Sequence, residues 1–415
     1  MVKSQCTTLK SGLTRKRIEI AQQQGRFKDV AFMYMKMAQD YPNDPKIDEV
    51  YYNAAVNFER AKLLGSAIQA REILLKTKPD SVLAKKAIYQ IGRNFQDVAA
   101  YNQAADYYEQ FAEKFPGEKE APVALYSASF YRRGLGDNEK AIKDVALYVK
   151  DYGGRHEFVD KAATTDFDQG QIYEVQHDNA KLMKHFTEYL KQWGGKGGVD
   201  HQIIAHVKIG ELLWNQSCPL PEGGINGACI EIKRERAGGA ARVAEKQAKA
   251  QKGKKKGKLK HANLPAQCGP ETKSKIIVHD RKPGPLKEAM THFAEALKLF
   301  KGGAADKSVP GKDETERAGR TAAMNYYASE ARFKQGDVEY EKFLKLAIPD
   351  KLDFSPAPPD ASPAKQKAAK KKLEENQKKF LAWLTGKGKQ IDAAQKVYQS
   401  VIQMKQAHWV IAAAA

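Results

Sequence analysis

The sequence lacks any apolar run that approaches the roughly 20 residues of a membrane span. Its first 20 residues contain no apolar stretch of the kind found in signal peptides. Residues 391–415 have a helical pattern that stops at Ala415 without a Gly, Pro or polar cap. We therefore expect a fragment of a longer polypeptide, so the missing signal peptide does not by itself favour the cytosol.

Motifs for catalysis and cofactor binding are also missing. The nine histidines are dispersed, and the sequence after His156 lacks the second histidine of a metalloprotease helix. The Gly/Lys run at 253–258 has the wrong spacing for a phosphate-binding loop, and the glycines at 194–198 follow a predicted helix instead of a strand. We expect a protein that is not an enzyme, with no cofactor and no metal site.

Acidic residues are too few to balance the basic ones, since 70 Lys and Arg against 50 Asp and Glu give a formal charge of +20. Residues 233–260 supply half of this excess, with twelve basic and two acidic side chains. No Phe, Tyr or Trp lies between Lys233 and Leu264, so this stretch offers no platform for stacking single-stranded bases. A solvated loop is the simpler interpretation, and a contact with nucleic acid or a membrane is the alternative.

What the sequence does contain is a repeat. Prolines recur every 37 residues and a second series keeps the same step: Pro42, Pro79 and Pro116, then Val30, Ala67, Ala104 and Ala141. A fixed period of this size indicates stacked helix pairs, none of which buries its apolar face alone. Small residues let two helix backbones approach each other, and the proline ends the second helix. We predict an all-α solenoid of antiparallel helix pairs.

These positions resemble the tetratricopeptide repeat (TPR), whose usual period is about 34 residues. The lengthened repeat and openings such as Tyr41-Pro42-Asn43-Asp44-Pro45 are similar to a subclass found in bacterial cell-envelope lipoproteins and periplasmic scaffold proteins. The 37-residue repeats, a helix pair that an insertion splits after Gln216, and Lys/Ala-rich segments are also similar to the large periplasmic TPR protein of myxobacterial gliding motility. The resemblance implies a TPR-like α-solenoid with a periplasmic location.

The function implied by this resemblance is a non-catalytic scaffold for other proteins within a bacterial cell-envelope assembly, related at its most specific to motility. The alternative is a cytoplasmic TPR adaptor whose basic loop binds nucleic acid or another polyanion. Salt distinguishes the two, because polyanion binding falls steeply as ionic strength rises.

The repeat register divides the chain into segments. A helix pattern around Gly210 fits a first helix, but its partner, with Ala289 and Phe293, appears 67 residues later than the register requires. Strand-like composition at 228–234 and 275–280 predicts a β-hairpin within this insertion. The expected segments are TPR-like repeats at 1–216, the Cys-containing hairpin insertion at 217–284 with a basic disordered loop at 237–264, continuing helices at 285–348, a Pro/Ala linker at 349–363, and a basic helix with further helices at 364–415, cut short by the end of the chain.

Two of the later segments carry finer predictions. Residues 315–347 are expected to form a helix pair. The last segment is expected to contain a basic helix at 364–384 and separate helices from Ile391 onward.

Three of the four cysteines, Cys218, Cys229 and Cys268, fall in the insertion. Small β insertions bury little apolar area and often need a covalent staple, so we expect one disulfide. Unpaired structural thiols and metal binding are the alternatives, and the absence of CxxC spacing weakens the second. Which two cysteines pair is left open by the sequence.

The resemblance also implies a binding face, because ligand-facing residues of this family lie on the concave side of each first helix. The corresponding positions here are Tyr52, Val56, Glu59, Tyr89, Arg93, Gln96, Tyr126, Phe130 and Arg133. The three tyrosines recur at the 37-residue step, and packing between neighbouring repeats is the alternative role for them.

Overall fold

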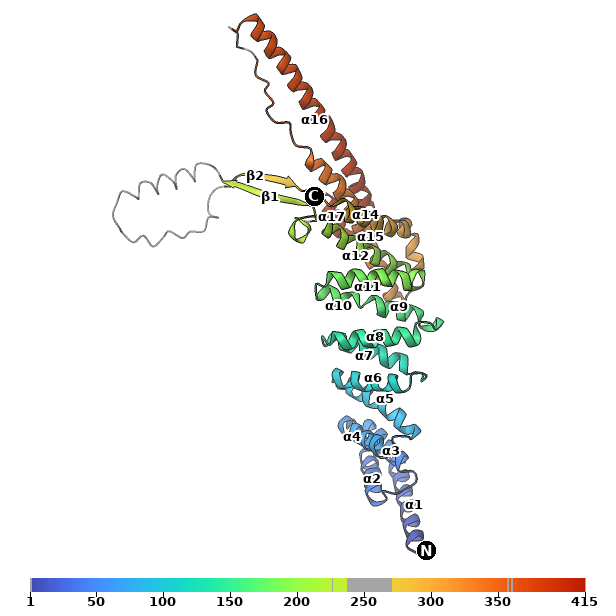
Figure 1. The fold of residues 1–415 in the computed structure, drawn as a ribbon. Coiled ribbons are helices and arrows are strands. Elements are labelled where there is room, and N and C mark those ends of the chain that lie inside the picture. Colours follow the sequence, from blue (N-terminus) through green and yellow to red (C-terminus); the bar gives the residue numbers. More distant parts are fainter. Residues whose placement is uncertain (1, 226, 237–270, 357, 360, 415) are drawn as a thin grey trace, which may run out of the picture. The chain divides into compact units, whose positions relative to one another are not determined.

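The structure is a computed structural model that describes residues 2–225, 227–236, 271–356, 358–359 and 361–414. Helices dominate these ranges, and the strands described form one two-stranded antiparallel sheet (Figure 1). The chain divides into two compact units, Met1–Asp178 and Asn179–Ala415, called here the N-terminal and the C-terminal unit. The predicted fold class, an all-α solenoid of helix pairs with a small β-hairpin, is confirmed.

Consecutive helices of the N-terminal unit pack against one another along the chain (Figure 1). The second helices of three successive pairs begin at residues 64, 101 and 138, each 37 residues after the last. The helices of this unit are α1 (Val2–Gln23), α2 (Phe27–Asp40), α3 (Ile47–Arg60), α4 (Leu64–Thr77), α5 (Val82–Asp97), α6 (Tyr101–Lys114), α7 (Ala121–Gly134), α8 (Asn138–Tyr152), α9 (Val159–Phe167) and α10 (Gly170–Val175).

The recurring residues explain these helices physically. Helices α2, α4 and α6 each end two residues before Pro42, Pro79 or Pro116, because the residue that precedes a proline disfavours helical backbone. Close packing within a pair needs small residues, as Gly92 shows: a Cβ atom there would lie 2.8 Å from the Tyr108 ring of the next helix.

The C-terminal unit contains α11 (Asn179–Gln192), α12 (Val199–Ser217), α14 (Pro283–Phe300), α15 (Glu314–Lys345), α16 (Pro363–Gln403), α17 (Ala407–Ala414) and the strands β1 (Ile230–Arg236) and β2 (Glu271–Val278). Helix α12 packs closely on α14, although the hairpin segment separates them in sequence. Gly210 makes this approach possible, since a Cβ atom there would stand 2.6 Å from the Phe293 ring.

The hairpin pairs its two strands in antiparallel register, with Ile230 opposite Val278 and Ile232 opposite Ile276. A disulfide joins Cys218, at the end of α12, to Cys229, just before β1, with a Cα–Cα distance of 5.6 Å. The structure therefore supplies the pairing that the sequence left open. Cys268 and the basic loop at 237–264 lie outside the described residues.

Two predictions about the last third of the chain were wrong. Residues 315–347 do not form a helix pair, because α15 is one continuous helix of 32 residues. Gly336 lies inside it and admits α16, whose Tyr398 ring would lie 2.5 Å from a Cβ atom at that position. The expected break between residues 384 and 391 is also absent, because α16 runs unbroken for 41 residues. Packing against α15 outweighs the low helix propensity of Gly386, since Lys387 donates a hydrogen bond of 2.6 Å to the Phe343 carbonyl.

Candidate functional site

The nine residues predicted to contact a partner lie on three successive first helices of the N-terminal unit. Arg93 and Phe130 are exposed, and the other seven are partly buried. Helix α3 carries Tyr52, Val56 and Glu59, helix α5 carries Tyr89, Arg93 and Gln96, and helix α7 carries Tyr126, Phe130 and Arg133.

The tyrosines at the first two positions pack between helices. Tyr52 lies against a buried cluster that includes Leu74 and Ala84, on the next two helices. The Tyr89 ring contacts Tyr108 and Phe111 of α6, with ring centroids 5.7 and 5.2 Å apart. Burial raises the pKa of the Tyr89 hydroxyl above its ordinary value. Tyr52 and Tyr89 therefore pack between helices, and only part of each side chain is open to solvent.

Glu59 takes part in a polar network that ties three helices together. Its carboxylate pairs with the buried Arg71 of α4 at 2.9 Å and accepts a hydrogen bond of 2.6 Å from the Asn94 amide of α5. Arg71 in turn donates to the Asn94 side-chain oxygen at 2.6 Å. Gln96 is similarly occupied, because its amide oxygen accepts a hydrogen bond from Tyr108 at 2.7 Å. Both predicted contact residues therefore help to hold the helices in place.

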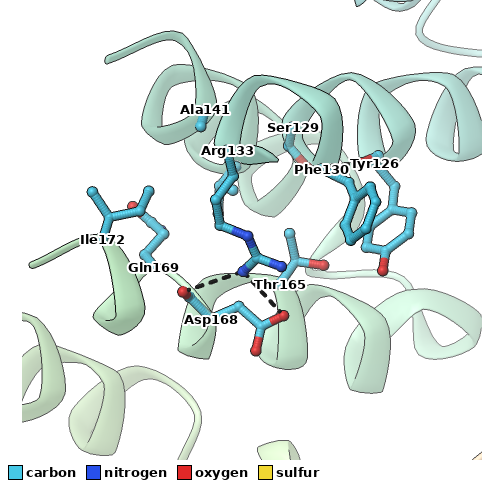
Figure 2. Close-up of a pocket in the computed structure, with 10 residues that line it drawn as sticks. Tyr126, Ser129, Phe130, Arg133, Ala141, Thr165, Asp168, Gln169 and Ile172 are labelled. Atoms are coloured by element: carbon cyan, nitrogen blue, oxygen red, sulfur yellow. Dashed lines mark hydrogen bonds and ion pairs between the residues drawn. The ribbon is translucent and has the colours of Figure 1, made fainter. Parts of the chain in front are cut away.

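The last three predicted residues meet at a notch between helices α7 to α10. Figure 2 shows Arg133 extending from α7 toward Asp168, with the rings of Phe130 and Tyr126 beside it. Arg133 lies 3.4 Å from the Asp168 carboxylate and donates a hydrogen bond of 3.4 Å to its backbone carbonyl. The Lys161 ammonium sits 3.6 Å from the centre of the Tyr126 ring. The structure thus gathers an exposed aromatic ring, a supported guanidinium and a second cation.

The size of the notch limits what it binds. Its free volume is about 20 Å³, enough for about one water molecule. Phe130 is 52% exposed and stands at the notch with its face 5.8 Å from the Arg133 guanidinium carbon. Aromatic side chains and arginine are both enriched at protein–protein interfaces. The geometry therefore suits contact with a protein surface better than enclosure of a small molecule.

Sequence reasoning missed a cluster of buried charges between helices α6, α7 and α8. Arg132 on α7 is fully buried and forms ion pairs with Asp106 and Glu109 of α6. Asp144 of α8 lies beside Glu109, and burial together with that negative charge raises the pKa of Asp144 to about 8. The available signal was positional, because Arg132 occupies the repeat position of Phe58 two repeats earlier.

A second buried cluster fastens the hairpin to the helices of the C-terminal unit. Arg281, just after β2, binds both carboxylate oxygens of Glu341 on α15, with its shortest contact at 2.7 Å. Its guanidinium carbon lies 3.5 Å from the centre of the Trp214 ring, and it donates a hydrogen bond to the Trp214 carbonyl. Glu341 also accepts a hydrogen bond of 2.7 Å from the backbone N–H of Cys229. The root of the hairpin is therefore fixed to α12 and to α15.

Neither a metal cluster nor a membrane span is seen in the described part of the chain. Its His, Cys, Asp and Glu side chains form no group of three placed to hold a metal ion. Its helices include none that is both long and apolar enough to cross a bilayer.

No protein-family model and no curated protein matches the chain. Several solved structures resemble it in part. MamA 41-end from Desulfovibrio magneticus RS-1 is 18% identical, with a TM-score of 0.29 over 44% of this chain and 94% of that one. BtubC from P. vanneervenii is 15% identical, with a TM-score of 0.29 over 42% and 76%. A Podosopora anserina putative kinesin light chain with nearly identical TPR-like repeats is 8% identical, with a TM-score of 0.29 over 44% and 93%. At this level the likenesses carry no argument about function, and the fold assignment rests on the helix pairs themselves.

Proposed function

We propose that this chain is a non-catalytic TPR-like scaffold that binds a partner protein along the first helices α3, α5 and α7. The exposed Phe130 beside Arg133 is the observation that carries the proposal. A partner that covers this ring removes apolar surface from solvent, which favours association. Arg133 is held by Asp168, so the pair presents a preformed contact that loses little entropy on binding.

The other predicted contact residues on α3, α5 and α7, called here the row, have lesser parts in this proposal. Arg93 is exposed and would contribute a charged contact at the rim, where charges affect association rate more than affinity. Tyr52, Tyr89 and Tyr126 would offer their exposed edges while their buried faces hold neighbouring helices together. Phe130 is therefore the expected anchor.

Site-specific photocrosslinking tests this assignment. A photoreactive phenylalanine analogue at position 130 should crosslink, in cells of the native host, to one or a few defined proteins. The matched control places the analogue at Glu139, an exposed residue of α8 outside the row, and should yield none of these products. Equal products at both positions, or none at position 130, would contradict the proposal.

The cellular setting is a finer proposal with separate support. The Cys218–Cys229 disulfide favours an oxidising compartment, because disulfides are rare in reducing cytosol. A role in a bacterial periplasmic or cell-envelope assembly, and in gliding motility as its most specific form, rests on the resemblance of the repeat openings and their 37-residue period. We also retain residues 217–284 as an insertion between two helices, supported by the close packing of α12 on α14.

A further inference from the structure

The N-terminal half of α16 is covered on one side by the segment that precedes it. Residues 346–356, called here the strap, run beside this helix (Figure 1). The Asn376 amide donates a hydrogen bond of 2.8 Å to the Asp353 carbonyl, and the Phe380 ring lies 5.9 Å from Phe354. The Trp383 indole N–H donates to the Leu346 carbonyl at 3.0 Å. The buried side of the helix is therefore the side that faces the strap.

The side of α16 next to the strap-facing side exposes leucines, with exposed lysines close by. Leu381 and Leu384 are 59% and 49% exposed, and Ile391, two turns further on, is 39% exposed. Their spacing places the three on one side of the helix. Nine lysines and two glutamates occupy residues 363–389, which gives this stretch a formal charge of +7. Lys378 and Lys389 lie close to Leu381, with Glu374 beside them, and the exposed Lys371 lies two turns before Lys378 on the same side of the helix.

The two kinds of side chain together indicate one kind of partner. A soluble polyanion would satisfy the lysines and leave the leucines in water. An anionic bilayer satisfies both, because its surface charge attracts the lysines and its interfacial region takes the leucines out of water. The helix is too polar to span a membrane, so it would lie in the interface. We propose that this side of α16 binds the surface of an anionic lipid bilayer.

Vesicle flotation of the full chain tests the proposal. At low ionic strength the protein should float with vesicles rich in phosphatidylglycerol and stay behind with pure phosphatidylcholine vesicles. Replacing both leucines, Leu381→Glu and Leu384→Glu, should reduce the partition coefficient at least about tenfold, because the apolar contact is lost. The triple variant Lys371→Gln, Lys378→Gln, Lys389→Gln should reduce it about tenfold or more and flatten its salt dependence.

The control tests whether the loss of any three exposed lysines is enough to weaken binding. A matched triple variant that replaces exposed lysines outside α16 should partition within about twofold of the parent; it carries Lys287→Gln, Lys298→Gln and Lys312→Gln. Far-UV circular dichroism should give all variants the melting temperature of the parent, because every substituted residue is exposed.

Three results would overturn the inference. If the leucine and lysine variants of α16 float as well as the parent, another part of the chain binds the vesicles. Heparin binding without flotation, unaffected by the leucine changes, would identify a soluble polyanion as the partner. Failure to float with either kind of vesicle would exclude a membrane contact.

Discussion

Replacing Arg281 by methionine is expected to lower the free energy of unfolding of the C-terminal unit by roughly 3–5 kcal/mol. Methionine keeps much of the apolar bulk over Trp214 but leaves the Glu341 carboxylate, which is 5% exposed, without its cation. A buried charge that loses its partner is among the most destabilising changes available to a folded protein. Urea unfolding followed by tryptophan fluorescence measures this loss directly, because all four tryptophans of the chain lie in this unit.

The neighbouring residue provides a matched control. Asp280 forms an exposed ion pair with Lys345 at 2.6 Å, so Lys345→Ala should cost far less stability than Arg281→Met. The double variant Arg281→Met, Glu341→Met removes both buried charges and should recover most of the stability. If Arg281→Met costs no more than Lys345→Ala, the buried cluster does not fasten the hairpin as described.

The second large effect is a gain, because Asp144→Asn should stabilise the N-terminal unit at neutral and alkaline pH. Asp144 is 4% exposed, and burial beside Glu109 raises its pKa from 3.8 to about 8. Between these values the folded protein holds a proton that the unfolded chain releases, so stability falls as pH rises through this interval. Asparagine is neutral throughout, and the gain should grow to at most about 6 kcal/mol above pH 8, at about 1.4 kcal/mol per pKa unit.

Thermal unfolding across pH 4 to 9 tests this expectation. The difference between variant and parent should be small near pH 4 and increase toward pH 8, and it should appear in the circular dichroism transition and not in tryptophan fluorescence. Glu139→Gln, an exposed change on the same helix, should shift stability by no more than about 0.5 kcal/mol at any pH. A constant difference at every pH would mean that Asp144 is not protonated in the fold.

The helix pairs could be predicted from the sequence because the same packing positions recur every 37 residues. Small residues such as Gly92 and prolines such as Pro79 act on the backbone of their own helix pair, so their spacing reports the helices directly. The hairpin followed in the same way, because strand composition is a local property. The sequence also pointed to Cys218 and Cys229 as disulfide candidates, but their pairing depends on how the chain folds back after α12.

The errors arose where distant residues decide the outcome. Judged from the neighbouring residues alone, Gly336 and Gly386 favour helix ends. Packing between α15 and α16 nevertheless keeps both helices continuous. Arg132 and Arg281 form buried ion pairs with Glu109 and Glu341 on other elements, so the sequence around each arginine does not identify its partner. At the candidate site, the residues that the resemblance implied lie on α3, α5 and α7, yet only the structure shows which of them are exposed.

The affinity of the full chain for the protein that crosslinks to position 130 tests the central claim most directly. Isothermal titration calorimetry should show that Phe130→Ala weakens binding roughly 30-fold, which corresponds to about 2 kcal/mol for a buried aromatic anchor. The same variant should keep the parent's melting temperature, because the Phe130 ring is 52% exposed in the free protein. Glu139→Ala should change the affinity by less than about twofold. Unchanged affinity in Phe130→Ala would show that the first helices are not the partner-binding surface.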